Sequence, residues 1–422
     1  MKARRFTPGV RISFAIAYLL IAGVFFFLVS LKSDPIADLA LTGANIYTSP
    51  HEPPISSGTV LIKDGKILAV GKSSDIQVHH KTPTIDCTGL TMTSGFWNCH
   101  VHLMENKWLG ADSLRDEVLT RQMQDMFTQY GFTYIFDLAT LAPENLAVIR
   151  DRISRGTVKG PRLLFTGIPI APRDASPFYI SPLKLAEPLN ADECAQHVST
   201  QFASGADAVK LWSSSPTRER VVPMALELIE TATRNAHRNH KQVFAHPSNL
   251  EGARLAARGG VDILAHVAAD DRKNWDSETL NLMLSRDMAL IPTLKLHKWD
   301  LEQFDSYSRE DPLIVTALLQ VGSYHEAGGE ILFGTDVGYM TDYSPEDEYL
   351  LMHEAGLDFN AILETLTVNP ARRFGLKGRT GKIAPGFDAD LVLLKGDPAI
   401  GVANFVNVKY TFRAGVMVYS SN

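Results

Sequence analysis

Apolar segments of strand length alternate with helical stretches over most of this 422-residue chain. The segments are short and rich in β-branched and aromatic residues, which is typical of buried strands. Eight can be counted, at residues 95–103, 132–139, 161–167, 208–212, 243–247, 263–267, 289–294 and 331–337. Strands that alternate with helices form parallel sheets, and eight such units close into a (β/α)8 barrel. We therefore predict an α/β fold with this barrel at residues 93–379.

Helices are expected between the strands, for example at residues 116–130 and 222–239. A third expected helix has clear end signals. Ser248 and Glu251 have the spacing of a capping box, and Gly259 with Gly260 marks a stop.

The two ends of the chain have a different texture, with short strands and no helical stretch between them. Asp64 and Gly65 separate two apolar runs, which is a strong hairpin signal because both turn residues tolerate positive φ. Short β segments return after residue 380. We predict that residues 34–92 and 380–422 together form a small β-sandwich domain.

Polar side chains interrupt the apolar strands near their carboxyl ends. In a barrel these ends converge on one mouth, where catalytic groups sit. His100 and His102 lie two positions apart in one strand, so they share a face and can hold one metal ion between them, while Trp97 and Cys99 face the other side. The complete set predicts a metal site, and it consists of His100, His102, Lys210, His246, His266 and Asp336.

A long motif follows the last barrel strand. It reads T-V-N-P-A-R-R-F-G-L at residues 367–376, followed by G-K-I-A-P-G-F-D-A-D-L-V-L-L at residues 381–394. With the H-x-H pair, the strand lysine, the two later histidines and the G-T-D at residues 334–336, it resembles the amidohydrolase superfamily, and within it the imidazolonepropionase-related and prolidase-like branch. The similarity covers about residues 39–418. Members are metal-dependent hydrolases, mostly of amide and other C–N bonds.

The resemblance implies two divalent ions at the barrel mouth. The ligands it implies are His100, His102 and Asp336 for the first ion, and His246 and His266 for the second. Lys210 would bridge the ions as a carboxylated lysine, because a carbamate carries negative charge and two oxygens, whereas an ammonium repels cations. Zinc is the first expectation from the nitrogen and oxygen ligands, and manganese, cobalt or iron also fit.

The expected activity is hydrolysis of an amide, peptide or cyclic amide bond by a metal-activated water, in the manner of a dipeptidase or prolidase. Asp336 would take a proton from the water and pass it to the leaving nitrogen. Asn98 stands where many relatives have Asp, and it would orient the first histidines. Alternatives are a one-metal, imidazolonepropionase-like ring-opening enzyme or a lactonase, with Lys210 merely structural, or an inactive membrane-anchored binding protein.

Two loops are expected at the barrel mouth, at residues 168–190 and 295–312. A small-molecule or dipeptide-like substrate with a carboxylate needs a cation or hydroxyl group there. The candidates on these and neighbouring loops are Arg173, Lys295, His297, Tyr339 and Tyr343.

The first 33 residues predict a membrane anchor or signal segment. Basic residues precede residues 12–31, which run for 20 residues without a charge. We expect an uncleaved anchor with the catalytic domain outside the cytoplasm, in the periplasm, or a secreted protein if the segment is cleaved. The net charge of −6 and pI of about 6.1 argue against a nucleic-acid partner, and a homo-oligomer is compatible with the sequence.

Overall fold

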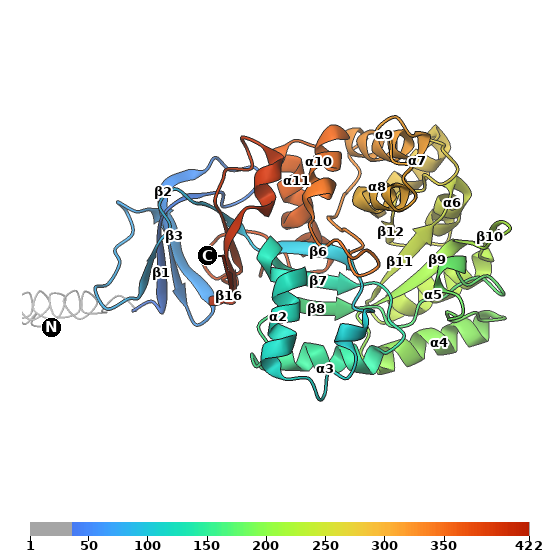
Figure 1. The fold of residues 1–422 in the computed structure, drawn as a ribbon, viewed down its shortest axis with the longest axis horizontal. Helices are drawn as coiled ribbons and strands as arrows, with labels where there is room; N and C mark the ends of the chain where they lie inside the picture. The colour runs from blue at the N-terminus through green and yellow to red at the C-terminus, as the bar shows by residue number, and fades with distance from the viewer. Residues whose placement is uncertain (1–35, 422) are drawn as a thin grey trace, which may run out of the picture.

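The computed structural model describes residues 36–421, which form a barrel with surrounding helices and a smaller sheet beside it (Figure 1). Seven named strands belong to the barrel wall: β6 (Phe96–Val101), β7 (Phe132–Asp137), β8 (Arg162–Phe165), β9 (Ala208–Pro216), β11 (Gln242–Pro247), β12 (Ile263–Ala265) and β13 (Ala289–Ile291). Neighbouring strands pair in parallel from β6 to β8 and from β9 through β11 and β12 to β13. Seven of the eight expected strands are thus present.

Two segments that do not form regular strands close the barrel. The segment after β8 joins β9, because the Ile170 amide donates to Lys210 O at 3.0 Å. Residues 331–337 form the eighth wall segment: Leu332 N donates to Leu290 O in β13, and Cys99 N in β6 donates to Phe333 O. The predicted TIM-barrel-like fold is confirmed, although the eighth segment is too irregular to form a regular ladder.

Helices surround the barrel wall. They are α2 (Asp116–Met126), α3 (Pro143–Ser154), α4 (Ala191–Ala203), α5 (Leu226–Arg238), α6 (Leu250–Arg258), α7 (Ser277–Ser285), α8 (Leu294–Gln303), α9 (Pro312–Glu326), α10 (Glu346–Glu354), α11 (Phe359–Leu366) and α12 (Val368–Arg373). Short 3-10 turns are η1 (Asn106–Trp108), η2 (Thr128–Tyr130), η3 (Phe178–Ile180) and η4 (Val402–Val406), and the short strand β10 (Val221–Pro223) extends β9.

Two local predictions were wrong. The cap of α6 is Asn249, whose side chain accepts from Gly252 N at 2.9 Å, whereas the Ser248 hydroxyl is used by Ser214 O in β9. The expected loop at 295–312 begins as helix α8. A residue far along the chain stabilises its first turn, because a Glu348 carboxylate oxygen accepts from Lys295 N at 2.7 Å. Both differences arise from contacts with distant segments, which a local motif does not contain.

The smaller sheet combines both ends of the chain, with strands β1 (Leu39–Ile46), β2 (Ile55–Lys63), β3 (Lys66–Lys72), β4 (Thr84–Asp86), β5 (Thr91–Ser94), β14 (Leu391–Leu394), β15 (Val408–Arg413) and β16 (Val416–Ser420). The strands form one mixed sheet in the order β16-β15-β14-β5-β1-β2-β3, with β4 on β1. Asp64 and Gly65 have φ of +50° and +73° in the β2–β3 turn, which confirms the hairpin. The expected sandwich is thus a single hydrogen-bonded sheet, because β5 and β14 pair directly. The exact domain boundaries stay predictions.

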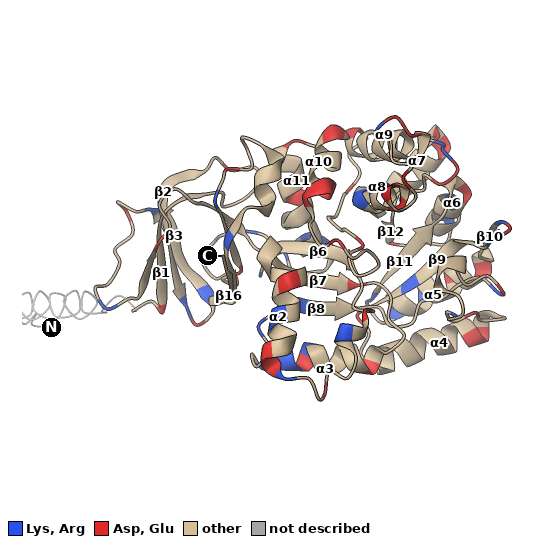
Figure 2. Ribbon diagram, in the orientation of Figure 1, with Lys and Arg blue, Asp and Glu red and all other residues tan. Residues whose placement is uncertain are grey.

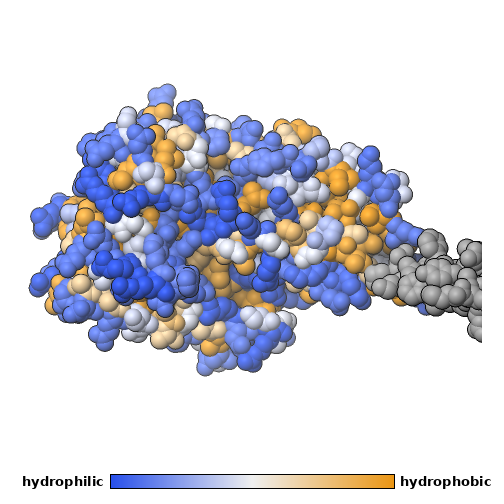
Figure 3. Space-filling view, turned by 180° about the vertical axis from the view of Figure 1, so that it is seen from behind, coloured by the Kyte–Doolittle hydropathy of each residue, from blue (hydrophilic) through white to orange (hydrophobic). Residues whose placement is uncertain are grey.

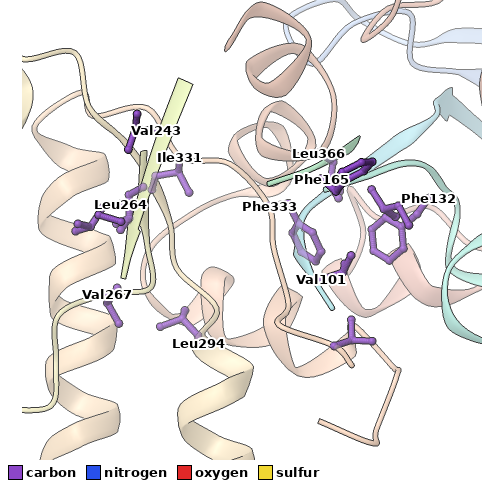
Figure 4. Close-up of a cluster of buried hydrophobic side chains, with 14 of the residues drawn as sticks. Val101, Phe132, Phe165, Val243, Leu264, Val267, Leu294, Ile331, Phe333 and Leu366 are labelled. Carbon is purple, nitrogen blue, oxygen red and sulfur yellow. The ribbon is translucent and has the colours of Figure 1, made fainter. Parts of the chain in front are cut away.

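Apolar side chains fill both the barrel and the layer between its wall and the helices. Figure 4 shows part of the outer layer, with Val243 and Leu264 from neighbouring strands and Phe132 and Phe333 further round the wall. Trp97 stacks on Tyr134 at 3.9 Å inside the barrel, and Cys99 belongs to the same inner cluster.

The inner position of Trp97 and Cys99 corrects the expectation that they face away from the histidines. The β6–β7 register shifts between Asn98 and Val101, so strict alternation fails there. As a result, Trp97 and Cys99 fill the barrel below the mouth while His100 and His102 reach the mouth itself.

Basic and acidic residues are both distributed along the outer helices (Figure 2). Seen from behind, hydrophilic residues prevail over the barrel, and apolar residues gather nearer the small sheet (Figure 3).

The predicted anchor at residues 12–31 lies outside the described residues. Among residues 36–421 no helix combines the length and the apolar composition that crossing a membrane requires. The predicted membrane-anchored location therefore has no support in the part of the chain that the structure describes, and we withdraw it.

Candidate metal centre

Six predicted residues lie at the mouth of the barrel. His100, His102, Lys210, His266 and Asp336 are all buried, and His246 is half-buried. Their imidazole rings form a continuous series: His102 to His100 at 5.2 Å between centroids, His100 to His266 at 4.6 Å, and His266 to His246 at 4.7 Å. Side chains from five different wall segments therefore meet, as the sequence predicted.

One carboxylate oxygen lies between two of these rings. Asp336 Oδ1 is 2.7 Å from His102 Nε2 and 3.3 Å from His100 Nε2. His100, His266 and Asp336 can each offer one ligand atom with all three atoms within 4.8 Å of one another. These distances suit ligands that share one cation.

The tautomer of His266 is set by Thr293. The Thr293 hydroxyl donates to Pro292 O at 2.8 Å, so its oxygen accepts from His266 Nδ1–H at 2.7 Å. The lone pair of His266 then lies on Nε2. A metal-binding histidine is commonly fixed in this way by a partner on its other nitrogen.

His246 lies at the far end of the ring series. Trp212 stacks on its imidazole at 5.1 Å and 18°. Burial lowers the pKa of His246 to about 3, and the charge of Lys210 acts in the same direction. Burial likewise lowers the pKa of His100 and of His266 well below the usual value. These three imidazoles are therefore neutral at physiological pH, which is the form that binds metals.

Lys210 is the one buried cation in this set. Among residues 36–421 no carboxylate lies within 4 Å of its Nζ, and Trp212 is the aromatic ring beside it, at 5.3 Å. Burial lowers the pKa of Lys210 to about 7, although the Asp336 charge raises it. A substantial fraction of the amine is therefore neutral near pH 7.

Asp336 is the buried anion of the site. Burial alone would raise its pKa, but the nearby His100 and His102 lower it below the ordinary value. Asp336 is thus ionised at neutral pH.

The backbone is strained at several of these positions. His266 has φ of +88°, Asp336 +62° and Thr293 +49°, values that non-glycine residues rarely adopt. Gly338 follows at +101°, and a Cβ on it would lie 1.7 Å from His102 O. The segment around Asp336 therefore approaches β6 so closely that only glycine fits at 338.

Two further residues hold the loops that carry the ligands. Asn98 donates to Thr335 Oγ1 at 2.8 Å and accepts from Thr335 N and His100 N at 3.2 and 3.3 Å, so it connects β6 to the segment of Asp336.

Asp137 was not predicted from the sequence. Its carboxylate accepts from Leu103 N at 2.6 Å and from Ala139 N, at the end of β7. Burial raises the pKa of Asp137 to about 6. Its position at a strand end was the available signal.

The five candidates for binding a substrate carboxylate differ in their surroundings. Arg173 is largely exposed and contacts Asp174 at 3.4 Å. Lys295 Nζ is held by Asp342, at 2.8 Å from both its backbone oxygen and its carboxylate, and Tyr343 donates to Glu105 at 2.7 Å. The side chains of Lys295 and Tyr343 are therefore already paired with other groups of the protein.

His297 and Tyr339 lie at the mouth. His297 is buried, and its Nε2 makes no hydrogen bond with any described residue. Burial lowers the pKa of His297 to about 4, against the opposing charge of Asp336. The Tyr339 ring packs edge-to-face against Tyr179 at 5.7 Å and against Trp299 at 6.0 Å.

Two carboxylates at the mouth were not predicted. Asp300 lies three residues after His297 in α8 and is half-buried, and Asp270 follows β12. Burial raises the pKa of Asp300 to about 7, and the charges of Asp336 and Asp270 raise it further. Their chain positions after wall segments were a signal, but acidic residues in surface loops are too common to be singled out.

Known proteins match this chain over most of its length. The sequence profile of the Amidohydrolase family matches residues 91–419. This chain belongs to the amidohydrolase family. It is 21% identical over 439 aligned positions to ochratoxinase from Aspergillus niger, covering 90% of this chain and 86% of that enzyme.

Solved structures share the amidohydrolase fold. A Xaa-Pro dipeptidase with bound methionine superimposes with a TM-score of 0.77 at 20% identity, covering 91% of this chain and all of that one. A putative prolidase from Bifidobacterium longum gives 0.77 at 23% identity, covering 91% and 95%. These structures show the shared fold, and membership of the amidohydrolase family makes the chain a hydrolase that acts on carbon–nitrogen bonds, as the sequence predicted.

The donor set fits the metal that amidohydrolases typically use. Three neutral imidazoles and one ionised carboxylate are buried together, and the Nδ1 atoms of His100, His102 and His246 make no hydrogen bonds to described residues.

Proposed function

We propose that this amidohydrolase cleaves the amide bond of a dipeptide-like small molecule, using two divalent metal ions at the barrel mouth. The observation that carries the proposal is the meeting of His100, His102, His246, His266, Lys210 and Asp336 at one end of the wall. The structural similarity to prolidase-like proteins supports a substrate of dipeptide size.

The proposed ligand roles are those that the resemblance to amidohydrolases implies. His100, His102 and Asp336 would hold one ion, and His246 and His266 the other. Zinc suits these ligands, and manganese, cobalt or iron would also be accepted. When bound, the ions supply Lewis-acid polarisation of the carbonyl and acidify a water.

Lys210 would bridge the ions as a carbamate. The ammonium first loses one proton to give the neutral amine, and the amine then adds to carbon dioxide with loss of a second proton, so that a cation becomes an anion. The lowered pKa of Lys210, about 7, makes this neutral amine accessible. Its burial and its lack of a carboxylate partner also favour the change, since an uncompensated buried ammonium is costly.

Asp336 would carry the proton. It is ionised, and its Oδ2 lies 3.9 Å from His266 Nδ1, on the other side from the oxygen that contacts His100 and His102. Oδ2 can therefore accept a proton from the attacking water and release it to the leaving nitrogen. Asn98 and Thr335 keep this carboxylate in place through the hydrogen bonds that join β6 to its segment.

A one-metal ring-opening enzyme remains the second candidate. The tight group His100, His266 and Asp336 alone could hold one ion, with Lys210 as a structural amine. The metal content per chain separates the two possibilities.

Hydrolysis of Phe-Pro by the full chain tests the proposal. We expect turnover after zinc or manganese and bicarbonate are added, and its loss with a chelator. Asp336→Asn should lower kcat between about 100- and 10,000-fold, whereas Asp305→Asn, an exposed carboxylate of the loop after α8, should not change it. Turnover that survives chelation, or hydrolysis of lactones but of no amide, would contradict the proposal.

A further inference from the structure

The end of the barrel opposite the metal centre contains a hollow lined by arginines. Its volume is about 770 Å³, within the range of about 300–1,000 Å³ that is usual for small-molecule sites. The hollow lies where α5, α6 and α7 end, just before β11, β12 and β13 begin. His246 and His266 lie at the other ends of β11 and β12. The hollow is therefore separate from the metal centre.

Four arginines from three successive helices line this hollow, and all four are exposed to solvent. They are Arg234 and Arg238, one turn apart on α5, Arg258 at the end of α6, and Arg286 directly after α7. The whole chain carries a net charge of −6, so the hollow is a local concentration of positive charge on an acidic protein.

These guanidinium groups have few partners in the protein. Within residues 36–421 the side chains of Arg238 and Arg286 make no hydrogen bond and no ion pair within 4 Å. Arg234 donates to one hydroxyl of its own helix at 3.2 Å, and Arg258 contacts Glu278 at 3.3 Å in an exposed ion pair, which contributes little. Most of their N–H donors thus stay available to a ligand.

The acidic residues of the hollow do not cancel this charge. Asp262 is already paired, because its two oxygens lie 3.0 and 2.9 Å from His237 Nε2 and one of them accepts from Val243 N at 2.7 Å. Glu230 is the other carboxylate that lines the hollow, and it is exposed. Four guanidinium groups therefore stand against one unpaired carboxylate.

A pair of glycines fixes the position of one arginine. Gly259 and Gly260 follow α6, and Gly260 has φ of +78°, a value that favours glycine. A Cβ on Gly259 would lie 2.3 Å from a side-chain carbon of Ile229 in α5. This close approach holds the end of α6, and with it Arg258, beside the arginines of α5.

Basic residues at helix C-termini also stabilise the helix dipole without any ligand. This effect accounts for one arginine at each helix end. It does not account for Arg234, which lies a full turn before Arg238, or for the grouping of all four around one hollow. In the described part of the chain none of the four guanidinium groups donates to a backbone carbonyl at a helix end.

The chemistry of the lining suits phosphate groups. A guanidinium presents a planar fork of N–H donors that matches two oxygens of a phosphate. Four of them around a hollow of this size suit a chain of phosphates better than a single one. Among the described residues of the lining the only ring is that of His237, which is paired with Asp262, so no ring is free to stack on a nucleotide base.

We infer that this hollow binds a linear chain of two or more phosphates through Arg234, Arg238, Arg258 and Arg286. The chain is either free polyphosphate or the phosphate tail of a nucleotide whose base stays in solvent. Once bound, it ties together the ends of α5, α6 and α7 and stabilises the folded protein in proportion to its affinity. The inference does not depend on the proposed function, because the ligand is neither the substrate nor part of the metal centre.

Isothermal titration calorimetry of the full chain with tripolyphosphate tests the inference, in a buffer of low ionic strength without free metal. We expect one tripolyphosphate per chain and an affinity that falls as salt is added, because salt screens exposed charges. Orthophosphate and citrate should bind about 10-fold more weakly or worse, since neither offers a chain of phosphates to all the arginines. ATP distinguishes the two sources: equal affinity assigns the site to a nucleotide tail as well, and weaker binding restricts it to free polyphosphate.

Variants show whether the arginines create the site. Arg238→Gln and Arg286→Gln should each weaken tripolyphosphate binding about 10-fold, and the double variant should show no measurable binding. Arg155→Gln is the matched control, because Arg155 is exposed and directly follows α3, as Arg286 follows α7, but does not line the hollow. It should bind like the wild-type protein. Tripolyphosphate should also raise the Tm of the wild-type protein and of the control, but not that of the double variant.

Three results would overturn the inference: no binding of tripolyphosphate to the wild-type protein, full affinity in the double variant, or citrate binding as tightly as tripolyphosphate. Binding that survives in the double variant but disappears when the metal is removed would assign the anion to the metal centre instead. The proposed function is judged by hydrolysis alone, so either result leaves it unaffected.

Discussion

Thr293 fixes the tautomer of His266 in the candidate metal centre, and its replacement by valine tests how much this hydrogen bond contributes to metal binding. Thr293→Val keeps the branched shape and removes the hydroxyl that accepts from His266 Nδ1 at 2.7 Å. Both residues are buried, with exposures of 0% and 5%, so water cannot replace the lost partner. We expect the metal affinity of the site to fall.

The size of this effect follows from the buried N–H that loses its acceptor. An unsatisfied buried donor costs about 1–3 kcal/mol, and about 1.4 kcal/mol corresponds to a tenfold change in affinity. His266 can avoid this cost by moving its proton to Nε2, but it then loses the lone pair that binds metal. The expected loss in affinity is therefore about 10- to 100-fold, as for other residues that orient metal ligands.

The assay is competition with a chromogenic zinc chelator, applied to the wild-type chain and two variants. Thr233→Val is the matched control, because the Thr233 hydroxyl is also buried but has no hydrogen-bond partner among the described residues. It should leave zinc affinity unchanged. If Thr293→Val binds zinc as tightly as the wild-type protein, the proposed role of Thr293 is wrong.

Two further predictions concern stability. Gly338→Ala places a Cβ 1.7 Å from His102 O, whereas Gly356→Ala, at almost the same φ of +102°, meets nothing within 4 Å. In urea unfolding we expect Gly356→Ala to lose about 1–2 kcal/mol from backbone strain and Gly338→Ala to lose several kcal/mol more; equal losses would contradict the close approach. Asp388 makes the free energy of unfolding depend on pH. Burial raises the pKa of Asp388, but ion pairs with Lys66, Arg379 and Arg162 outweigh burial and lower this pKa. The ionised carboxylate therefore stabilises the fold above the pKa of the unfolded chain, about 3.9, and this contribution disappears as pH falls through the lower folded pKa. The free energy of unfolding should decrease more steeply between pH 5 and pH 3 in the wild-type protein than in Asp388→Asn, and parallel curves would refute the role.

The sequence was sufficient for features that depend on local pattern. Strand positions follow from apolar runs, and the β2–β3 hairpin follows from Asp64 and Gly65, because these patterns reflect burial and turn geometry at the residues themselves. The convergence of Lys210 and His246 was predictable too, since closing the barrel brings strand ends together.

Features that depend on distant contacts could not be read in this way. The positive φ of His266 is imposed by its surroundings, and the hydrogen bond with Thr293 crosses 27 positions of sequence. Helix α8 was mistaken for a loop because Glu348, far along the chain, caps its first turn.

The metal content of the chain tests the central claim most directly. The wild-type protein and Lys210→Ala are prepared with added zinc or manganese and bicarbonate, and bound metal is determined by elemental analysis. We expect close to two equivalents for the wild-type chain and one or fewer for the variant. One equivalent in both would contradict the carbamate bridge and favour the one-metal enzyme, and no metal in folded protein would contradict the metal centre itself.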